Sequence, residues 1–219
     1  MRVQGLAGTA VSVALMVSGA VRAEAEIRTD GLSGRSLKTW KAILVVIEAV
    51  GPDGQPLHPT LHRLYRELDS SAHAVRILIP DTKGSSAIAG RIRIEALGAD
   101  GRHEATILLN SRTIDRVLTG SADAQLVTFE RLSRTERYAQ VLGHEMAHAA
   151  WTFAEAERAR LVVEVQRRSL ELARRAQTEG TAGEGFSDAV QENERLVRLL
   201  EEPALAAEAA ITEELRASR

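Results

Sequence analysis

The chain contains no cysteine among its 219 residues, and only three of its 28 basic residues are lysine. Without cysteine there is no disulfide framework, no thiolate metal cluster and no cysteine nucleophile. Aromatic residues make up 3% of the chain and the formal net charge is −2. The chain therefore has neither a strongly positive surface charge nor the aromatic residues on which the bases of single-stranded nucleic acids stack. We expect no nucleic-acid partner.

Long hydrophobic runs are also scarce, and the longest lies at the N-terminus. Arg2 precedes a weakly apolar segment over 5–21, and the small residues of Ala23-Glu24-Ala25 follow it. This order is typical of an export signal, with cleavage after Ala23 or after Ala25. An uncleaved N-terminal anchor is the alternative, since the run approaches spanning length. We predict a signal peptide over 1–25 and a periplasmic or secreted protein without stable membrane insertion after signal removal.

The length and the 44% hydrophobic content suit one compact domain or two very small ones. We predict a single domain over 26–219. The first half, 26–130, reads mostly as strands, apart from a short helix over 60–68 and an ambiguous stretch over 111–130. Apolar or alternating runs bounded by turn residues predict a buried strand over 41–50, a strand over 74–80 and a hairpin over 91–97 and 105–110.

From Ser133 onward the pattern is helical, so 131–219 form the helical half of an α+β fold. Ser133 and Glu136 match a capping box at the start of one helix. Thr152 and Glu155 match a second capping box, which predicts a new helix running to about Gln177. A glycine-rich break separates that helix from a third over 188–201, and Pro203 is expected to start a fourth.

The first of these helices carries the sequence "HEMAH", with His144, Glu145 and His148. On a helix, residues four apart lie about 40° from each other on one face, so both imidazoles reach one metal ion. Glu145 lies about 100° further round the helix than His144, beside such an ion, where it would act as a general base. A structural helix with two hydrogen-bonded histidines is the alternative, but burying these groups without a metal costs free energy.

This stretch resembles the zincin zinc metallopeptidases, whose extended motif has uncharged residues around the two histidines. Val141, Leu142, Ala149 and Ala150 fit that pattern. The resemblance implies a zinc cofactor held by His144 and His148, catalysis by Glu145, and a peptide or protein substrate. It also implies a third zinc ligand further along the chain.

The third ligand is expected to be a carboxylate, as in the gluzincin type of zincin. Position 154, where the metzincin pattern needs a histidine, is alanine, and no histidine follows His148. Glu208 lies in the apolar, small-residue stretch "PALAAEAAI", where a lone carboxylate needs a partner such as zinc. Glu184 is the second choice, although Gly183 and Gly185 place it in a loop. We therefore predict His144, His148 and Glu208 as the metal ligands.

Two functions remain open on these residues. The first is an exported zinc peptidase, which Glu145 favours because a structural zinc site needs no acid there. The second is a zinc-binding envelope protein with the same scaffold and little hydrolysis. It is favoured by the absence after His148 of any Tyr or His that could stabilise an oxyanion.

His58 and His62 also have ligand-like spacing, but Pro59 interrupts it and we expect both at the surface.

Overall fold

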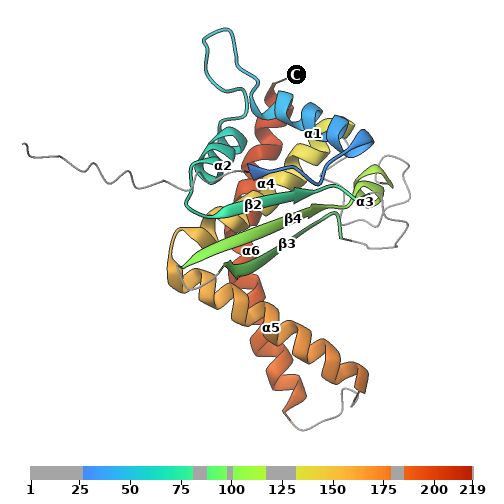
Figure 1. Cartoon of the computed structure of the whole chain (residues 1–219), viewed down its shortest axis with the longest axis vertical. Coiled ribbons are helices and arrows are strands. Elements are labelled where there is room, and N and C mark those ends of the chain that lie inside the picture. The colour runs from blue at the N-terminus through green and yellow to red at the C-terminus, as the bar shows by residue number, and fades with distance from the viewer. Residues whose placement is uncertain (1–26, 81–87, 98–100, 117–131, 179–184, 219) are drawn as a thin grey trace, which may run out of the picture.

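A four-stranded sheet forms one side of the molecule (Figure 1). The computed structural model describes residues 27–80, 88–97, 101–116, 132–178 and 185–218. The strand order is β1-β2-β4-β3, in which β1, β2 and β4 are mutually parallel and β3 is an antiparallel edge strand. The strands are β1 (Ile27–Arg28), β2 (Ala74–Leu78), β3 (Gly90–Leu97) and β4 (Arg102–Leu109). The predicted strand over 74–80 and the predicted hairpin are confirmed.

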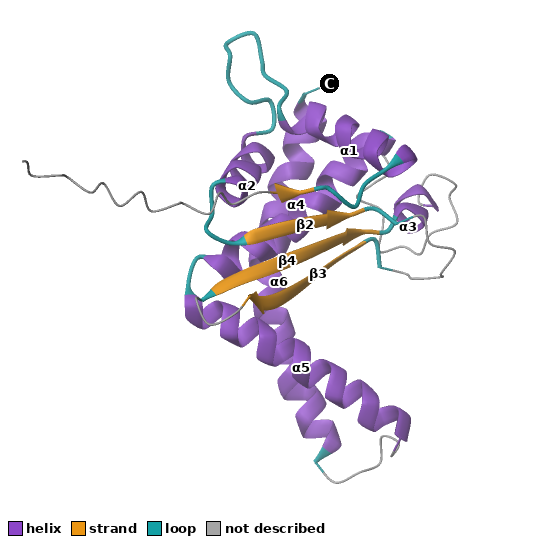
Figure 2. Ribbon diagram, in the orientation of Figure 1, coloured by secondary structure: helices purple, strands orange, loops and turns teal. Residues whose placement is uncertain are grey.

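Most of the described residues are helical, so the fold is mixed α+β with a small sheet (Figure 2). The helices are α1 (Gly34–Ile47), α2 (Pro59–Asp69), α3 (Ser111–Arg116), α4 (Arg134–Phe153), α5 (Ala156–Thr178) and α6 (Phe186–Ala217). Within the described ranges, none of the helices has the length and apolar character needed to cross a bilayer. The predicted signal peptide over 1–25 and the candidate ligand Glu184 lie outside the described residues.

The predicted strand over 41–50 is wrong, because these residues belong mainly to helix α1. The run is rich in β-branched residues, which favoured the strand reading. Its buried side chains instead recur at helical spacing, with Trp40, Ile43 and Ile47 in the core and Val45 71% exposed. One apolar stripe of a helix, rather than both faces of a strand, therefore packs against the core.

Helix α4 is the central element of the core. It packs against α1, α2, α6 and strands β3 and β4, and it lies with α6 behind the sheet in Figure 1. Tyr138, Ala139, Leu142, Met146 and Ala149 are fully buried along it. Because α4 is packed on several sides, the position of its two histidines relative to the sheet is fixed.

The helical half differs from prediction at two boundaries. Thr152 does not begin a helix: α4 continues to Phe153, and the Thr152 hydroxyl donates to the carbonyl of His148 at 2.7 Å. Pro203 does not begin one either, since it lies inside the 32-residue helix α6. Buried Leu200 and Ala204 on either side of Pro203 pack in the core, and this packing outweighs the missing backbone donor.

Helices α5 and α6 leave the globular part together. The C-terminal part of α5 and the N-terminal part of α6 form a hairpin that projects away from the sheet (Figure 1). The remainder of α6 runs back along α4, past the two histidines. A single long helix thus connects the projecting hairpin to the centre of the molecule.

Candidate metal centre

The local sequence fixes where α4 begins. The Ser133 hydroxyl accepts from the backbone N–H of Glu136 at 3.3 Å, and the Glu136 carboxylate accepts from the backbone N–H of Ser133 at 2.5 Å. This reciprocal pair satisfies two backbone donors and confirms the predicted capping box. From this start, the third and fourth turns of the helix carry His144, Glu145 and His148.

The two histidines project from the same side of α4. Their ring centroids are 4.9 Å apart with the rings nearly perpendicular, and both residues are largely buried. The predicted pairing of the two imidazoles is therefore present in the structure.

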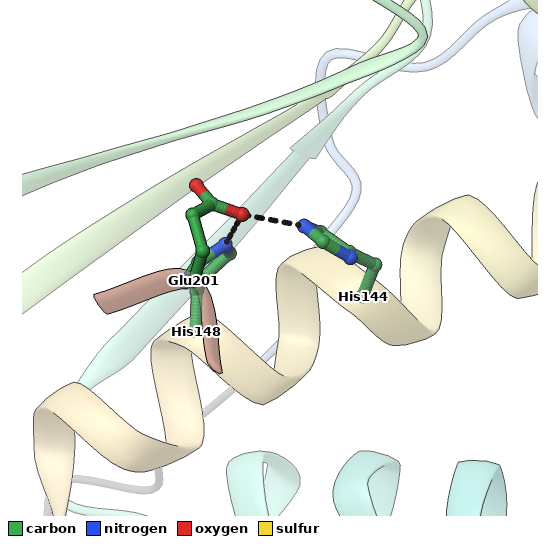
Figure 3. Close-up of side chains that lie close together, drawn as sticks. All are labelled: His144, His148 and Glu201. Carbon is green, nitrogen blue, oxygen red and sulfur yellow. Dashed lines mark ion pairs between the residues drawn. The ribbon is translucent and has the colours of Figure 1, made fainter. Parts of the chain in front are cut away.

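Helix α6 brings a carboxylate to this pair, and the residue is Glu201. Its Oε2 atom lies 3.4 Å from the Nε2 atom of His144 and 3.4 Å from the Nε2 atom of His148 (Figure 3). One ligand atom from each residue lies within 4.8 Å of the other two, which makes this the one metal-compatible cluster in the described part of the chain. Two imidazole nitrogens and a carboxylate oxygen are a donor set that suits a transition-metal ion.

Glu208, which we expected beside both imidazoles, lies on the other side of one of them. Its Oε2 atom is 2.8 Å from the Nδ1 atom of His144. Gln140 is 2.5 Å from the Thr212 hydroxyl and within 3.5 Å of the second Glu208 oxygen, and that hydroxyl donates to the Glu208 carbonyl. Glu208 is thus held where it can accept a hydrogen bond from the Nδ1 atom of His144.

Glu201 was not predicted as a ligand because the predicted third helix ends at this residue. In one continuous helix, positions seven apart lie two turns from each other on the same face. Glu201 and Glu208 have this spacing, so reading through Pro203 would have placed both carboxylates on the side of α6 that faces the histidines.

Glycine at position 143 allows α6 to approach α4 this closely. A Cβ atom at Gly143 would overlap the Cδ1 atom of Ile211 and would lie 3.1 Å from the Cδ1 atom of Leu61. Because Gly143 directly precedes His144, any increase in the α4–α6 separation would also move Glu208 and Glu201 away from the imidazoles.

Glu145 is buried beside the cluster, on the side of strand β3. It is 6% exposed, and a Cβ atom at Gly90 would overlap its Oε1 atom. Burial raises the pKa of Glu145 to about 7, the charges of His144 and His148 oppose this rise, and those of Glu201 and Glu208 add to it. A carboxyl group in this position can both take up and release a proton near neutral pH.

The charges in the site depend on one another. Burial disfavours protonation of His144, but its hydrogen bonds to Glu201 and Glu208 outweigh burial and raise its pKa to about 10. The same contacts, from His144 and then His148, hold the pKa of Glu201 far below its usual range. The carboxylates of Glu201 and Glu208 therefore favour positive charge at His144.

The other histidine pair does not form a comparable site. His58 lies at the N-cap of α2 and is only 5% exposed, so the expectation of a surface position was wrong for this residue. Burial, the largest effect, lowers the pKa of His58. Neither His58 nor His62 belongs to the metal-compatible cluster of the described residues.

Comparisons of the chain with protein-family models, with curated proteins and with solved structures find no match.

Proposed function

We propose that the protein is a zinc-dependent peptidase, with His144, His148 and Glu201 as zinc ligands and Glu145 as general base. The observation that carries this proposal is the position of Glu201 Oε2, 3.4 Å from the Nε2 atoms of both histidines. Ligands bound to zinc at about 2.0–2.1 Å in a tetrahedral arrangement are separated by about 3.3–3.4 Å. Both distances thus already match those between ligands of one tetrahedral ion.

The surrounding residues support an open, catalytic kind of zinc site. A structural site is usually closed by a fourth protein ligand, whereas three residues form this cluster in the described part of the chain. Glu208 on Nδ1 of His144 is the kind of carboxylate partner that orients a metal-binding imidazole.

A bound zinc ion would supply Lewis-acid chemistry, polarising the scissile carbonyl and lowering the pKa of the attacking water to about 7. Glu145 would take the proton from that water and pass it to the departing amine. Its position supports this role, because Glu145 directly follows a proposed ligand and is buried beside the cluster.

The position of β3 favours a peptide as the substrate. This strand is the edge of the sheet, and its first residue, Gly90, lies directly against Glu145. An edge strand can bind an extended peptide through backbone hydrogen bonds. A peptide paired with β3 near Gly90 would therefore place its backbone carbonyls beside the base and the proposed ligands.

A zinc-binding protein with little hydrolysis is the second candidate, and one observation favours it. The chain has no Tyr or His after His148 that could stabilise an oxyanion. Tyr138 is fully buried and its hydroxyl lies 3.3 Å from the Ser111 carbonyl and 3.4 Å from Asp115, so it does not fill this role. In the peptidase, the donor would have to be an arginine or a backbone N–H.

Glu145→Gln separates the two candidates, because it removes the base and keeps the shape of the side chain. We expect zinc per chain to stay at the wild-type level while hydrolysis of a mixed peptide library falls by about 10²–10⁴-fold. Glu157→Gln, an exposed change on α5, is the matched control and should alter neither quantity. A wild-type protein that binds zinc and cleaves nothing in the library would favour the second candidate.

A further inference from the structure

The edge of β3 is not uniformly accessible along its length. In an antiparallel pair, residues alternate between those bonded to the neighbouring strand and those whose N–H and C=O point away from it. The N–H of Asn110 donates to the carbonyl of Ala89, which places Ala89 among the residues bonded to the β4 side. By this alternation the backbone polar groups of Gly90, Ile92 and Ile94 point away from β4, toward the open edge.

A side chain of α5 occupies the third of these positions. The Oε1 atom of Gln166 accepts from the backbone N–H of Ile94 at 3.4 Å. Neighbouring Val162 and Val165 are buried in the core, so α5 is fixed in this place. The backbone donor that an added strand would use at Ile94 is therefore already bonded within the chain.

Side-chain burial also increases along the strand from Gly90 toward Ile94. Ile92 and Ile94 lie on one face of the strand, because side chains alternate with a period of two, and Ile88 lies just before the strand. Ile88 is 58% exposed, Ile92 is partly buried and Ile94 is 3% exposed. The strand is thus open at the end next to Glu145 and covered by α5 at the other end.

We propose that Gln166 is a specificity-determining residue that limits how far an extended substrate can pair with β3. This inference rests on the proposed peptidase function. Among the described residues, the outward backbone groups of Gly90 and Ile92 have no partner, whereas the Ile94 N–H is bonded to Gln166. A substrate therefore has room for about two paired residues on that side of the scissile bond. The preferred substrates are consequently short peptides or chain ends, rather than the interior of a long extended chain.

The test uses two nested sets of peptides with one central cleavage sequence. One set is extended stepwise on the amino side of the scissile bond and the other on the carboxyl side. We expect kcat/KM of the wild type to fall in only one set, by at least about fivefold once the extension passes about two residues. This is the scale expected when a paired backbone group is left without its partner. KM should account for most of the fall, since binding of the extension is what is lost.

Variants at position 166 connect this length limit to the side chain. Gln166→Ala should relax the limit in the same set of peptides and leave kcat/KM for the shortest peptides unchanged. Gln166→Glu keeps an oxygen acceptor for Ile94 and should keep the limit, and Gln177→Ala, an exposed change on α5, is the matched control.

Equal rates for all lengths in the wild type, or a length limit that Gln166→Ala leaves intact, would overturn the inference while the peptidase function stands. Failure to cleave any peptide by zinc-loaded wild type would instead contradict the peptidase function itself.

Discussion

The Oε2 atom of Glu208 lies 2.8 Å from the Nδ1 atom of His144. A neutral imidazole that donates its Nδ1 proton to a carboxylate presents an unprotonated Nε2, as a metal ligand must, and Nε2 is the atom that faces Glu201. In the proposed site, Glu208 thus positions His144 without binding the metal, although it was the ligand predicted from the sequence. The two carboxylates of α6 lie at opposite nitrogens of one ring.

If Glu208 orients His144 without binding the metal, Glu208→Gln should weaken zinc binding without abolishing it. The amide can still accept a hydrogen bond from Nδ1 but carries no charge, so the basicity of the imidazole falls. We expect zinc affinity to decrease by about 10–100-fold, with one zinc still bound per chain at saturation. Isothermal titration calorimetry measures both quantities, and Glu213→Gln, an exposed position on α6, is the control. Complete loss of stoichiometric binding would instead indicate that Glu208 is a ligand.

Gly143→Ala tests whether close contact between α4 and α6 holds the site together. Alanine is favoured over glycine within a helix by about 1 kcal/mol, but overpacking at the Ile211 contact costs about 1–3 kcal/mol. We therefore expect a net loss in the free energy of unfolding, measured by denaturant titration, together with weaker zinc binding.

Ile211→Val supplies the control for this change, because it removes the Cδ1 atom that the new Cβ would overlap. The double variant should recover zinc affinity relative to Gly143→Ala alone. A Gly143→Ala protein that is as stable as wild type and binds zinc equally well would show that the contact is not limiting.

The environment of His73 predicts a pH-dependent contribution to stability that does not involve the proposed metal ligands. The Nδ1 atom of His73 accepts the backbone N–H of His103 at 3.1 Å, and its ring stacks on Phe153 with centroids 4.4 Å apart. Burial, and then the charges of His103 and Arg102, lower the pKa of His73 below 6.5. A lowered histidine pKa means that the unfolded chain binds the proton more tightly, so this stabilisation is present above pH 6.5 and is lost as the pH falls.

His73→Asn keeps an acceptor for the His103 N–H but cannot be protonated in this range. Between about pH 7.5 and about pH 5.5, the wild type should lose stability relative to His73→Asn, measured as the difference in free energy of unfolding. Parallel pH profiles for the two proteins would contradict the assigned role of His73.

Export remains a prediction from the sequence alone, since residues 1–26 lie outside the described part of the chain. Mass spectrometry of the protein from the envelope or medium of an expressing bacterium should find an N-terminus at Glu24 or Glu26. A soluble cytoplasmic protein that retains Met1 would contradict the predicted signal.

The sequence predicted the elements whose signals are local. The capping box at Ser133 and the spacing of His144 and His148 depend on a single helix, and the structure has both. The β3–β4 hairpin likewise depends on alternation and a short connection. Each of these features is decided within a few residues, so no knowledge of the tertiary packing is needed.

The features that could not be predicted depend on packing between distant segments. Residues 41–50 have a strand-like composition, but burial of a helical stripe including Ile43 and Ile47 decides in favour of a helix. Pro203 is a typical helix-starting residue, yet α6 continues on both sides of it because the helix packs against α4. Because that continuity places Glu201 beside the histidines, the same error in secondary structure also concealed the proposed third ligand.

The most direct test of the proposed metal centre is the zinc content of Glu201→Ala beside that of Glu202→Ala, measured by elemental analysis after zinc loading and extensive dialysis. The two residues are adjacent on α6, but only Glu201 contacts the histidines in the described structure. The proposed centre predicts about one zinc per chain in the wild type and in Glu202→Ala, and a large loss in Glu201→Ala. Equal zinc content in the two variants, or no zinc in the wild type, would contradict it.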